Sequence, residues 1–96
     1  MLTNGQSASA AMSCAALLHD SDLGTIIGEE PRSTASQYGM AILSRLTQSN
    51  FVIAMSHIKL IRPNPELDKS DKSIINIYVP EKESALDASI VFLRSR

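Results

Sequence analysis

The chain opens its first predicted helix with the stretch Asn4-Gly5-Gln6-Ser7-Ala8-Ser9-Ala10-Ala11, in which a turn signal leads directly into an apolar run. An Asn-Gly pair favours chain reversal, and a small hydroxyl residue is a favoured N-cap. The first turn of a helix also carries unpaired N–H groups and a partial positive charge. Ser9 therefore has two interpretations: it is an ordinary N-cap, or it is a nucleophile whose oxyanion forms at the helix entrance.

The apolar run predicts a helix from about Ser9 to His19. Its apolar residues go almost all the way round, so we expect burial on more than one side. Cys14 lies in this run and is the single cysteine, which excludes an intrachain disulfide and favours a buried small hydrophobe. The expected packing residues include Met12, Ala15, Ala16 and Leu18.

Strand signals follow the first helix. The segment 25–28 is predicted to be a short buried strand closed by glycine, and the polar segment 29–36 is predicted to be a loop. Two β-rich runs, 38–46 and 51–61, are separated by Thr47-Gln48-Ser49-Asn50, which is typical of a hairpin. Both faces of the second run are apolar, so we expect it to be covered on both sides.

The last third of the chain predicts one more strand and one more helix. Arg62-Pro63-Asn64-Pro65 ends the hairpin, 66–72 is a charged loop, and 74–79 is a short strand stopped by Pro80. Ser84 and Asp87 have the spacing of an acidic capping box. The order helix–strand–β-hairpin–strand–helix indicates a mixed α/β fold. The expected stripe of the final helix is Leu86, Ile90 and Leu93.

Composition excludes several classes of function. The 96 residues have a net charge of -1, and no Lys or Arg precedes Arg32, so a basic stripe for nucleic acid is absent. No Cys/His cluster has zinc spacing, and we expect neither metal nor cofactor. The apolar run 10–18 is too short to span a bilayer. It also lacks a preceding basic segment and a cleavage pattern, so we expect no signal peptide.

Five motifs, in this order, resemble the C-terminal half of the catalytic domain of tail-specific (C-terminal processing) serine peptidases. The resemblance implies a partial crotonase/ClpP-like α/β fold and a serine endopeptidase that cleaves peptide bonds. Members of the family are often extracytoplasmic; the compartment of this chain stays open. The motifs are Leu2-Thr3-Asn4, Ser7-Ala8-Ser9-Ala10, Thr25-Ile26-Ile27-Gly28-Glu29, Arg62-Pro63-Asn64-Pro65 and Asn76-Ile77-Tyr78-Val79.

The resemblance places the catalytic nucleophile on Ser9, with Ser7 as the second choice. It implies that the backbone N–H of Ala10 forms part of the oxyanion hole. The family's base lysine falls at about Thr34, and no lysine occurs before Lys59. The family's glutamate after the serine pair is also replaced, by Met12.

Three other residues have chemistry suited to a base. His19 lies ten residues beyond Ser9 on the predicted helix, about 15 Å along its axis, which is far beyond hydrogen-bond reach if the helix is continuous. His57 and Lys59 belong to the second hairpin run, where a solvated strand position is the simpler interpretation. The identity of the base is therefore open.

We expect residues 1–96 to form the C-terminal portion of a peptidase-like catalytic domain that is incomplete alone. Without the base lysine and the upstream half, the isolated chain is expected to be inactive. Its expected partners are a peptide or protein substrate and either a second copy or the missing N-terminal half. The main alternative is a non-catalytic relative that binds peptides or acts in assembly. A crotonase-type acyl-CoA enzyme fits the Ser-Ala-Ser-Ala and Arg-Pro motifs less well.

Overall fold

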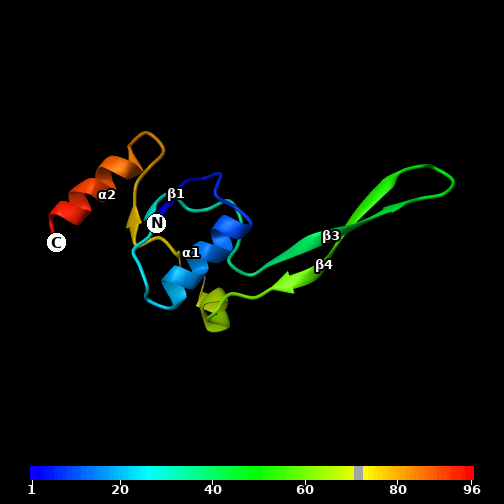
Figure 1. Ribbon diagram of the computed structural model, residues 1–96, viewed down its shortest axis with the longest axis horizontal. Helices are drawn as coiled ribbons and strands as arrows, with labels where there is room; N and C mark the ends of the chain where they lie inside the picture. The colour runs from blue at the N-terminus through cyan, green and yellow to red at the C-terminus, as the bar shows by residue number, and fades with distance from the viewer. Residues whose placement is uncertain (71–72) are drawn as a thin grey trace.

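The chain folds into a small body and a long two-stranded arm, as seen in a computed structural model that describes residues 1–70 and 73–96 (Figure 1). The mixed α/β class expected from the sequence is confirmed, and a strand before the first helix and a 3-10 helix after the hairpin are additional. Residues 71 and 72 of the expected charged loop lie outside the described residues. The elements are β1 (Leu2–Thr3), α1 (Ala10–Asp20), β2 (Ile27–Gly28), β3 (Gln37–Arg45), β4 (Val52–Leu60), η1 (Pro65–Ser70), β5 (Ile77–Tyr78) and α2 (Ala85–Arg94).

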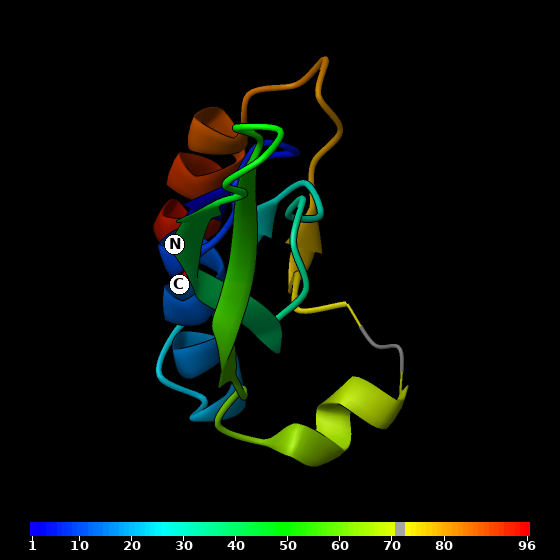
Figure 2. The same cartoon turned by 90° about the vertical axis from the view of Figure 1, so that its right-hand side faces the viewer.

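The body is built on a parallel sheet with the strand order β1-β2-β5. Both helices lie on the same side of this sheet (Figure 2). Asn76 reinforces the sheet, because its Oδ1 accepts a hydrogen bond of 2.7 Å from the backbone N–H of Ile26. The buried core is small and dominated by short side chains. It consists of Met12, Ala15, Ala16, Ile26, Ala35 and Ile74, with Met1 and Ile75 packed against it.

The centre of this sheet requires glycine at position 28. Gly28 has φ 137°, a conformation that side chains rarely adopt, and an added Cβ would lie 2.0 Å from the backbone oxygen of Thr3. The backbone N–H of Glu29 donates to that same oxygen at 3.2 Å. The close approach of β1 and β2 therefore depends on the missing side chain.

We expect Gly28→Ala to lower the free energy of unfolding by about 2–4 kcal/mol, because the substitution adds both backbone strain and a clash with β1. Urea denaturation monitored by circular dichroism measures the change. Gly24→Ala is the matched control, since its added Cβ would meet only the side chain of Leu18 at 3.9 Å. Equal stability of the two variants would contradict this description of the sheet.

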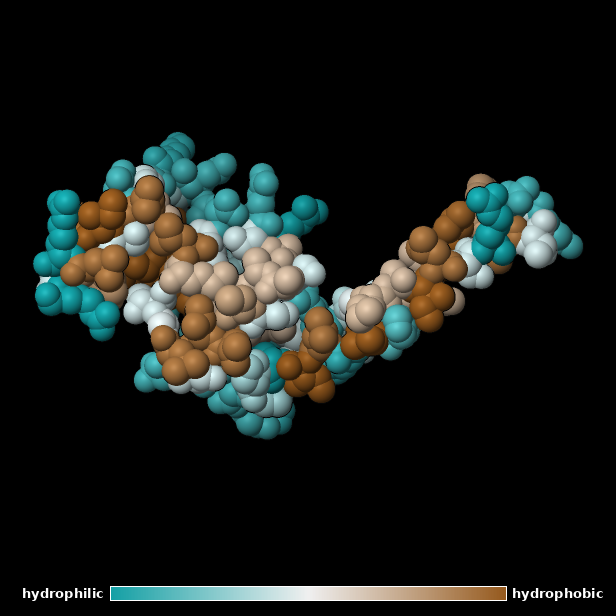
Figure 3. Space-filling view, viewed as in Figure 1, coloured by the Kyte–Doolittle hydropathy of each residue, from teal (hydrophilic) through white to brown (hydrophobic). Residues whose placement is uncertain are grey.

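The arm, which we define as residues 37–61, extends away from the body (Figure 1). Its strands β3 and β4 pair antiparallel with each other, and in the described residues neither joins the body sheet. The expected hairpin is confirmed, but the expectation that its second strand is covered on both sides is wrong. Nearly every arm residue is exposed, since no other described element lies against it. Figure 3 shows apolar side chains along much of the arm, which ends in a hydrophilic tip.

Both helices are less buried than their sequences predict. Only one side of α1 packs on the core, because the described chain supplies layers on that side alone; Leu17 is 51% exposed and Cys14 is exposed, which corrects the prediction of a buried thiol. The predicted stripe of α2 also faces outward rather than inward. The half-buried residues of α2 are instead Ala85, Ala88, Ser89 and Phe92.

The cap of α2 is confirmed, since Ser84 Oγ accepts a hydrogen bond of 3.2 Å from the backbone N–H of Asp87. Across residues 1–70 and 73–96, the helices fall short of the length and apolar character that crossing a membrane requires.

Candidate active site

Ser9 occupies a strained position at the entrance of α1. It is the N-cap residue, with φ 54° and ψ -119°, and its side chain makes no capping hydrogen bond to the helix. A positive φ is uncommon for a residue other than glycine, and such outliers concentrate at functional sites. A serine on a sharp strand-to-helix turn is also how α/β-hydrolases expose their nucleophile. The ordinary N-cap interpretation therefore fails at the hydroxyl, which is left exposed and unused by the helix.

The helix entrance offers a donor next to this hydroxyl. Ala10 is the first residue of α1, so its N–H has no intrahelical partner, as for the first residues of any helix. The positive end of the helix dipole lies at the same place. A developing oxyanion beside Ser9 would meet both.

Backbone contacts hold Ser9 in place from two other segments. Its N–H donates to Ser33 Oγ at 3.2 Å, and its carbonyl oxygen accepts from Gln37 Nε2 at 3.0 Å. Gln37 Nε2 also reaches Ser13 Oγ at 3.5 Å. The loop after β2 and the first residue of β3 thus fix the strained turn, and neither Ser33 nor Gln37 was singled out from the sequence.

The hydroxyl of Ser7, the second choice for the nucleophile, is already hydrogen-bonded within the turn. Its Oγ accepts from the backbone N–H of Asn4 at 3.1 Å and donates to Asn4 Oδ1 at 3.3 Å. Its backbone N–H donates to Asn4 O at 2.9 Å. The Asn-Gly turn predicted from the sequence is therefore closed by Ser7, and the geometry favours Ser9 as the free hydroxyl.

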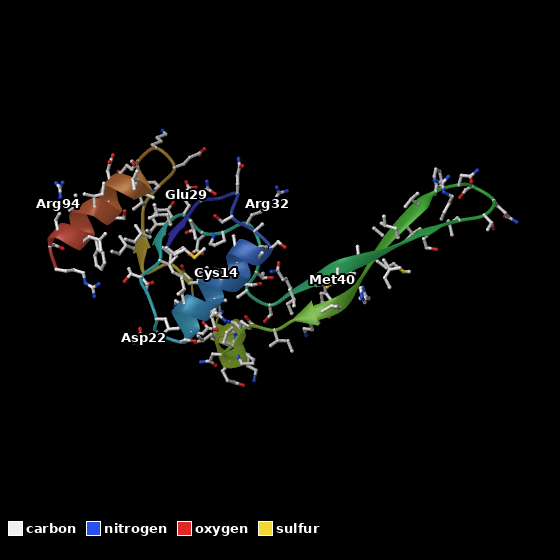
Figure 4. The ribbon with its side chains drawn as sticks, in the orientation of Figure 1. Cys14, Asp22, Glu29, Arg32, Met40 and Arg94 are labelled. Carbon is white, nitrogen blue, oxygen red and sulfur yellow. The ribbon has the colours of Figure 1, made fainter. Side chains whose placement is uncertain are left out.

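The hydroxyl of Thr34, the expected base position, is hydrogen-bonded within its own loop rather than to Ser9. Thr34 Oγ1 donates to the backbone oxygen of Ser36 at 2.6 Å, whereas the preceding residue, Ser33, contacts Ser9. Arg32 lies beside the N-terminal end of α1 (Figure 4). The loop therefore brings the hydroxyl of Ser33 to Ser9, and a hydroxyl is not a general base near neutral pH.

His19, His57 and Lys59 lie on elements other than this turn. Because α1 is continuous from residue 10 to 20, His19 lies at its opposite end, where Nδ1 is 3.0 Å from Asp20 Oδ1. The exclusion of His19 is thereby confirmed. His57 and Lys59 lie on β4, and Lys59 Nζ sits 5.8 Å from the ring centroid of Tyr38. In the described residues, no hydrogen bond joins Ser9 to a lysine or a histidine.

A cleft of about 670 Å³ opens at the carboxyl ends of the three parallel strands, the usual edge for ligands in such sheets. Glu29 shapes it, because its Oε2 accepts from the backbone N–H of Gly5 at 2.7 Å. The cleft reaches Gln6 but does not include Ser9 in its lining, so the hydroxyl lies outside it. Within the ranges 1–70 and 73–96, no three His, Cys, Asp or Glu side chains are grouped to hold a metal ion.

A buried ion pair lies at the C-terminal end of α1. Arg62 Nε donates to Asp20 Oδ2 at 2.9 Å and Nη2 to Oδ1 at 2.5 Å, while the backbone N–H of Asn64 donates to Oδ2 at 3.0 Å. The side chains of Asp20 and Arg62 are 0% and 3% exposed. The hydrogen bond from Arg62 holds the pKa of Asp20 well below its usual range, against the opposing effect of burial. This ion pair joins the base of the arm to α1, the helix that Ser9 precedes.

Comparison with protein-family models, with curated proteins and with solved structures gave no match to this chain.

Proposed function

We propose that this chain is the nucleophile-bearing portion of a serine endopeptidase of the tail-specific family. The observation that carries the proposal is the strained Ser9 at the entrance of α1, with a hydroxyl that the helix does not use. The ordered motifs of the sequence support the same assignment. The parallel order β1-β2-β5, with both helices on one side, is compatible with the finer proposal of a partial crotonase/ClpP-like fold.

In this function, Ser9 Oγ attacks the carbonyl carbon of a peptide bond and loses its proton to a base. The resulting oxyanion accepts a hydrogen bond from the N–H of Ala10, at the positive end of α1. Collapse of the tetrahedral intermediate breaks the C–N bond, and the amine leaves with a proton. Water then hydrolyses the acyl-enzyme. Gln37 and Ser33 act as positioning residues because they hold the backbone of Ser9.

A specific contact favours a second candidate function. Ser33 meets the backbone of Ser9 at the place where a base is needed, and its hydroxyl cannot take a proton efficiently at neutral pH. The second candidate is therefore a non-catalytic relative that keeps the fold for peptide binding or assembly. Peptide turnover that is abolished by Ser9→Ala would eliminate this candidate.

We expect a fluorophosphonate probe to label the chain slowly, and Ser9→Ala to abolish the labelling. The labelling is slow because a serine without an adjacent base is a weak nucleophile. Ser44→Ala is the matched control, since Ser44 is an exposed serine of β3 that pairs with Ile53 and is expected to keep the wild-type rate. Gel fluorescence over time measures the rate. Labelling that survives Ser9→Ala, or that is lost with Ser44→Ala alone, would overturn the assignment.

A further inference from the structure

We infer that the arm is a self-association device, in which one apolar face packs antiparallel on the same face of a second copy. The face is defined by the pairing register of β3 and β4, in which directly opposed residues share a side of the ribbon. Ile42 is opposite Met55, Ser44 opposite Ile53, and Tyr38 opposite Lys59. The large apolar residues of this arm face are Tyr38, Ile42, Leu46, Phe51, Ile53 and Met55.

These six side chains are 40% to 71% exposed in a single chain. Face-to-face packing would remove them from water, and burial of apolar area is the main driving force of such association. The opposite face of the arm also carries apolar side chains, at Leu43, Val52, Ile58 and Leu60, but it interrupts them with small or polar residues. These interrupting residues are Gln37, Gly39, Ala41, Arg45, Ala54 and Ser56. The arm face carries more large side chains, including both aromatic rings of the arm, and is therefore the face better suited to a packed interface.

The exposed surface of a single chain is large enough to supply a dimer interface. The chain exposes 7084 Å². A compact monomer of the same mass exposes about 5,400 Å² by the usual scaling with size. The excess is roughly 1,700 Å², whereas each partner of a standard interface contributes about 800 Å². The area that each chain would bury in such a dimer is therefore smaller than its excess exposed surface.

Charge favours the antiparallel over the parallel orientation of the two copies. Residues 37–61 contain Arg45 and Lys59 but no Asp or Glu, so two arms stacked in parallel would place like charges together. A nine-residue strand is about 30 Å long. In the antiparallel stack the two Lys59 residues, near the base of each arm, lie at opposite ends, beyond the Debye length of about 8 Å at physiological salt. Each Lys59 then faces the neutral tip 47–50 of the partner.

Adjacent residues of β4 provide the test. Met55 lies on the arm face and Ser56 on the opposite face, and both are exposed, so aspartate at either position adds the same charge to the same strand. We expect wild-type chain at micromolar concentration to sediment as a dimer. We expect Met55→Asp to weaken dimerisation by about 30-fold or more, as loss of a central interface contact does, and Ser56→Asp to change it less than about 5-fold.

A second measurement keeps the inference testable if Met55→Asp disturbs the arm itself. In a Cys14→Ser background, Met55→Cys is expected to cross-link to its own copy with a short bis-maleimide, whereas Ser56→Cys is not. A monomer at all concentrations, equal weakening by both aspartates, or a different protein bound in place of a second copy would overturn the inference. None of these outcomes depends on whether Ser9 reacts.

Discussion

Ser33→Lys is expected to accelerate fluorophosphonate labelling of Ser9 by about 100-fold or more, the contribution of a positioned general base. The Oγ of Ser33 already lies 3.2 Å from the backbone nitrogen of Ser9. A lysine side chain at this position is long enough to reach the Ser9 hydroxyl, and both Ser33→Lys and Ser33→Arg give up the hydrogen bond that Ser33 Oγ accepts from the backbone of Ser9. Only the neutral amine accepts the proton, so the rate should rise with pH toward the pKa of the lysine.

Two variants control for charge and position. Ser33→Arg adds the same charge but no base, because a guanidinium does not lose its proton in proteins, and it is expected to keep the slow rate. Thr34→Lys is expected to have a smaller effect than Ser33→Lys, since Thr34 bonds to Ser36 rather than to Ser9. Equal rates for Ser33→Lys and Ser33→Arg would contradict a nucleophile at Ser9 that lacks only its base.

Arg62→Ala is expected to lower the free energy of unfolding by about 3–5 kcal/mol, because it leaves the buried carboxylate of Asp20 without its partner. This loss is a large fraction of the stability of a small domain. Chemical denaturation measures it. Lys69→Ala is the matched control: it removes a cation from the exposed pair with Glu66, both side chains 74% exposed, and is expected to cost less than about 1 kcal/mol.

The same ion pair predicts how stability depends on pH. Because the pKa of Asp20 is lowered in the folded chain by Arg62, the pair contributes its stability above the unfolded pKa of about 3.9 and loses it as pH falls toward the folded value. Arg62→Ala raises the pKa of Asp20, because the largest of the interactions that lower it is lost and only the contacts from His19 and Asn64 then oppose burial. The acid transition therefore moves to higher pH. An unchanged acid midpoint in Arg62→Ala would show that Asp20 does not govern it.

Local signals in the sequence predicted most of the elements, but not β1 or η1. Helix α1, the hairpin and the cap of α2 follow from hydrophobic periodicity, turn residues and the Ser84–Asp87 spacing, and their ends shifted by only a residue or two. Burial was predicted less well. Cys14, the arm and the outward stripe of α2 are exposed because burial depends on which layers lie against an element, and periodicity shows an apolar face without showing its cover.

The candidate site was likewise predicted only in part from the sequence. The position of Ser9 at the helix entrance follows from the small-residue run before α1, but its positive φ does not, because tertiary contacts from Ser33 and Gln37 hold that conformation. The buried partner of Asp20 was also missed. The sequence favours a surface or loop-anchoring role for Arg62, but it does not identify the partner, because only the fold brings Arg62 to a carboxylate 42 positions earlier.

Peptide mapping by mass spectrometry of the exhaustively labelled wild-type chain identifies the reactive serine most directly. We predict the phosphonyl group on Ser9, with no adduct on Ser7, which closes the turn, or on Ser13, which lies within α1. An adduct on Ser7 or Ser13, or an even distribution over the serines of the chain, would contradict a nucleophile at the entrance of α1.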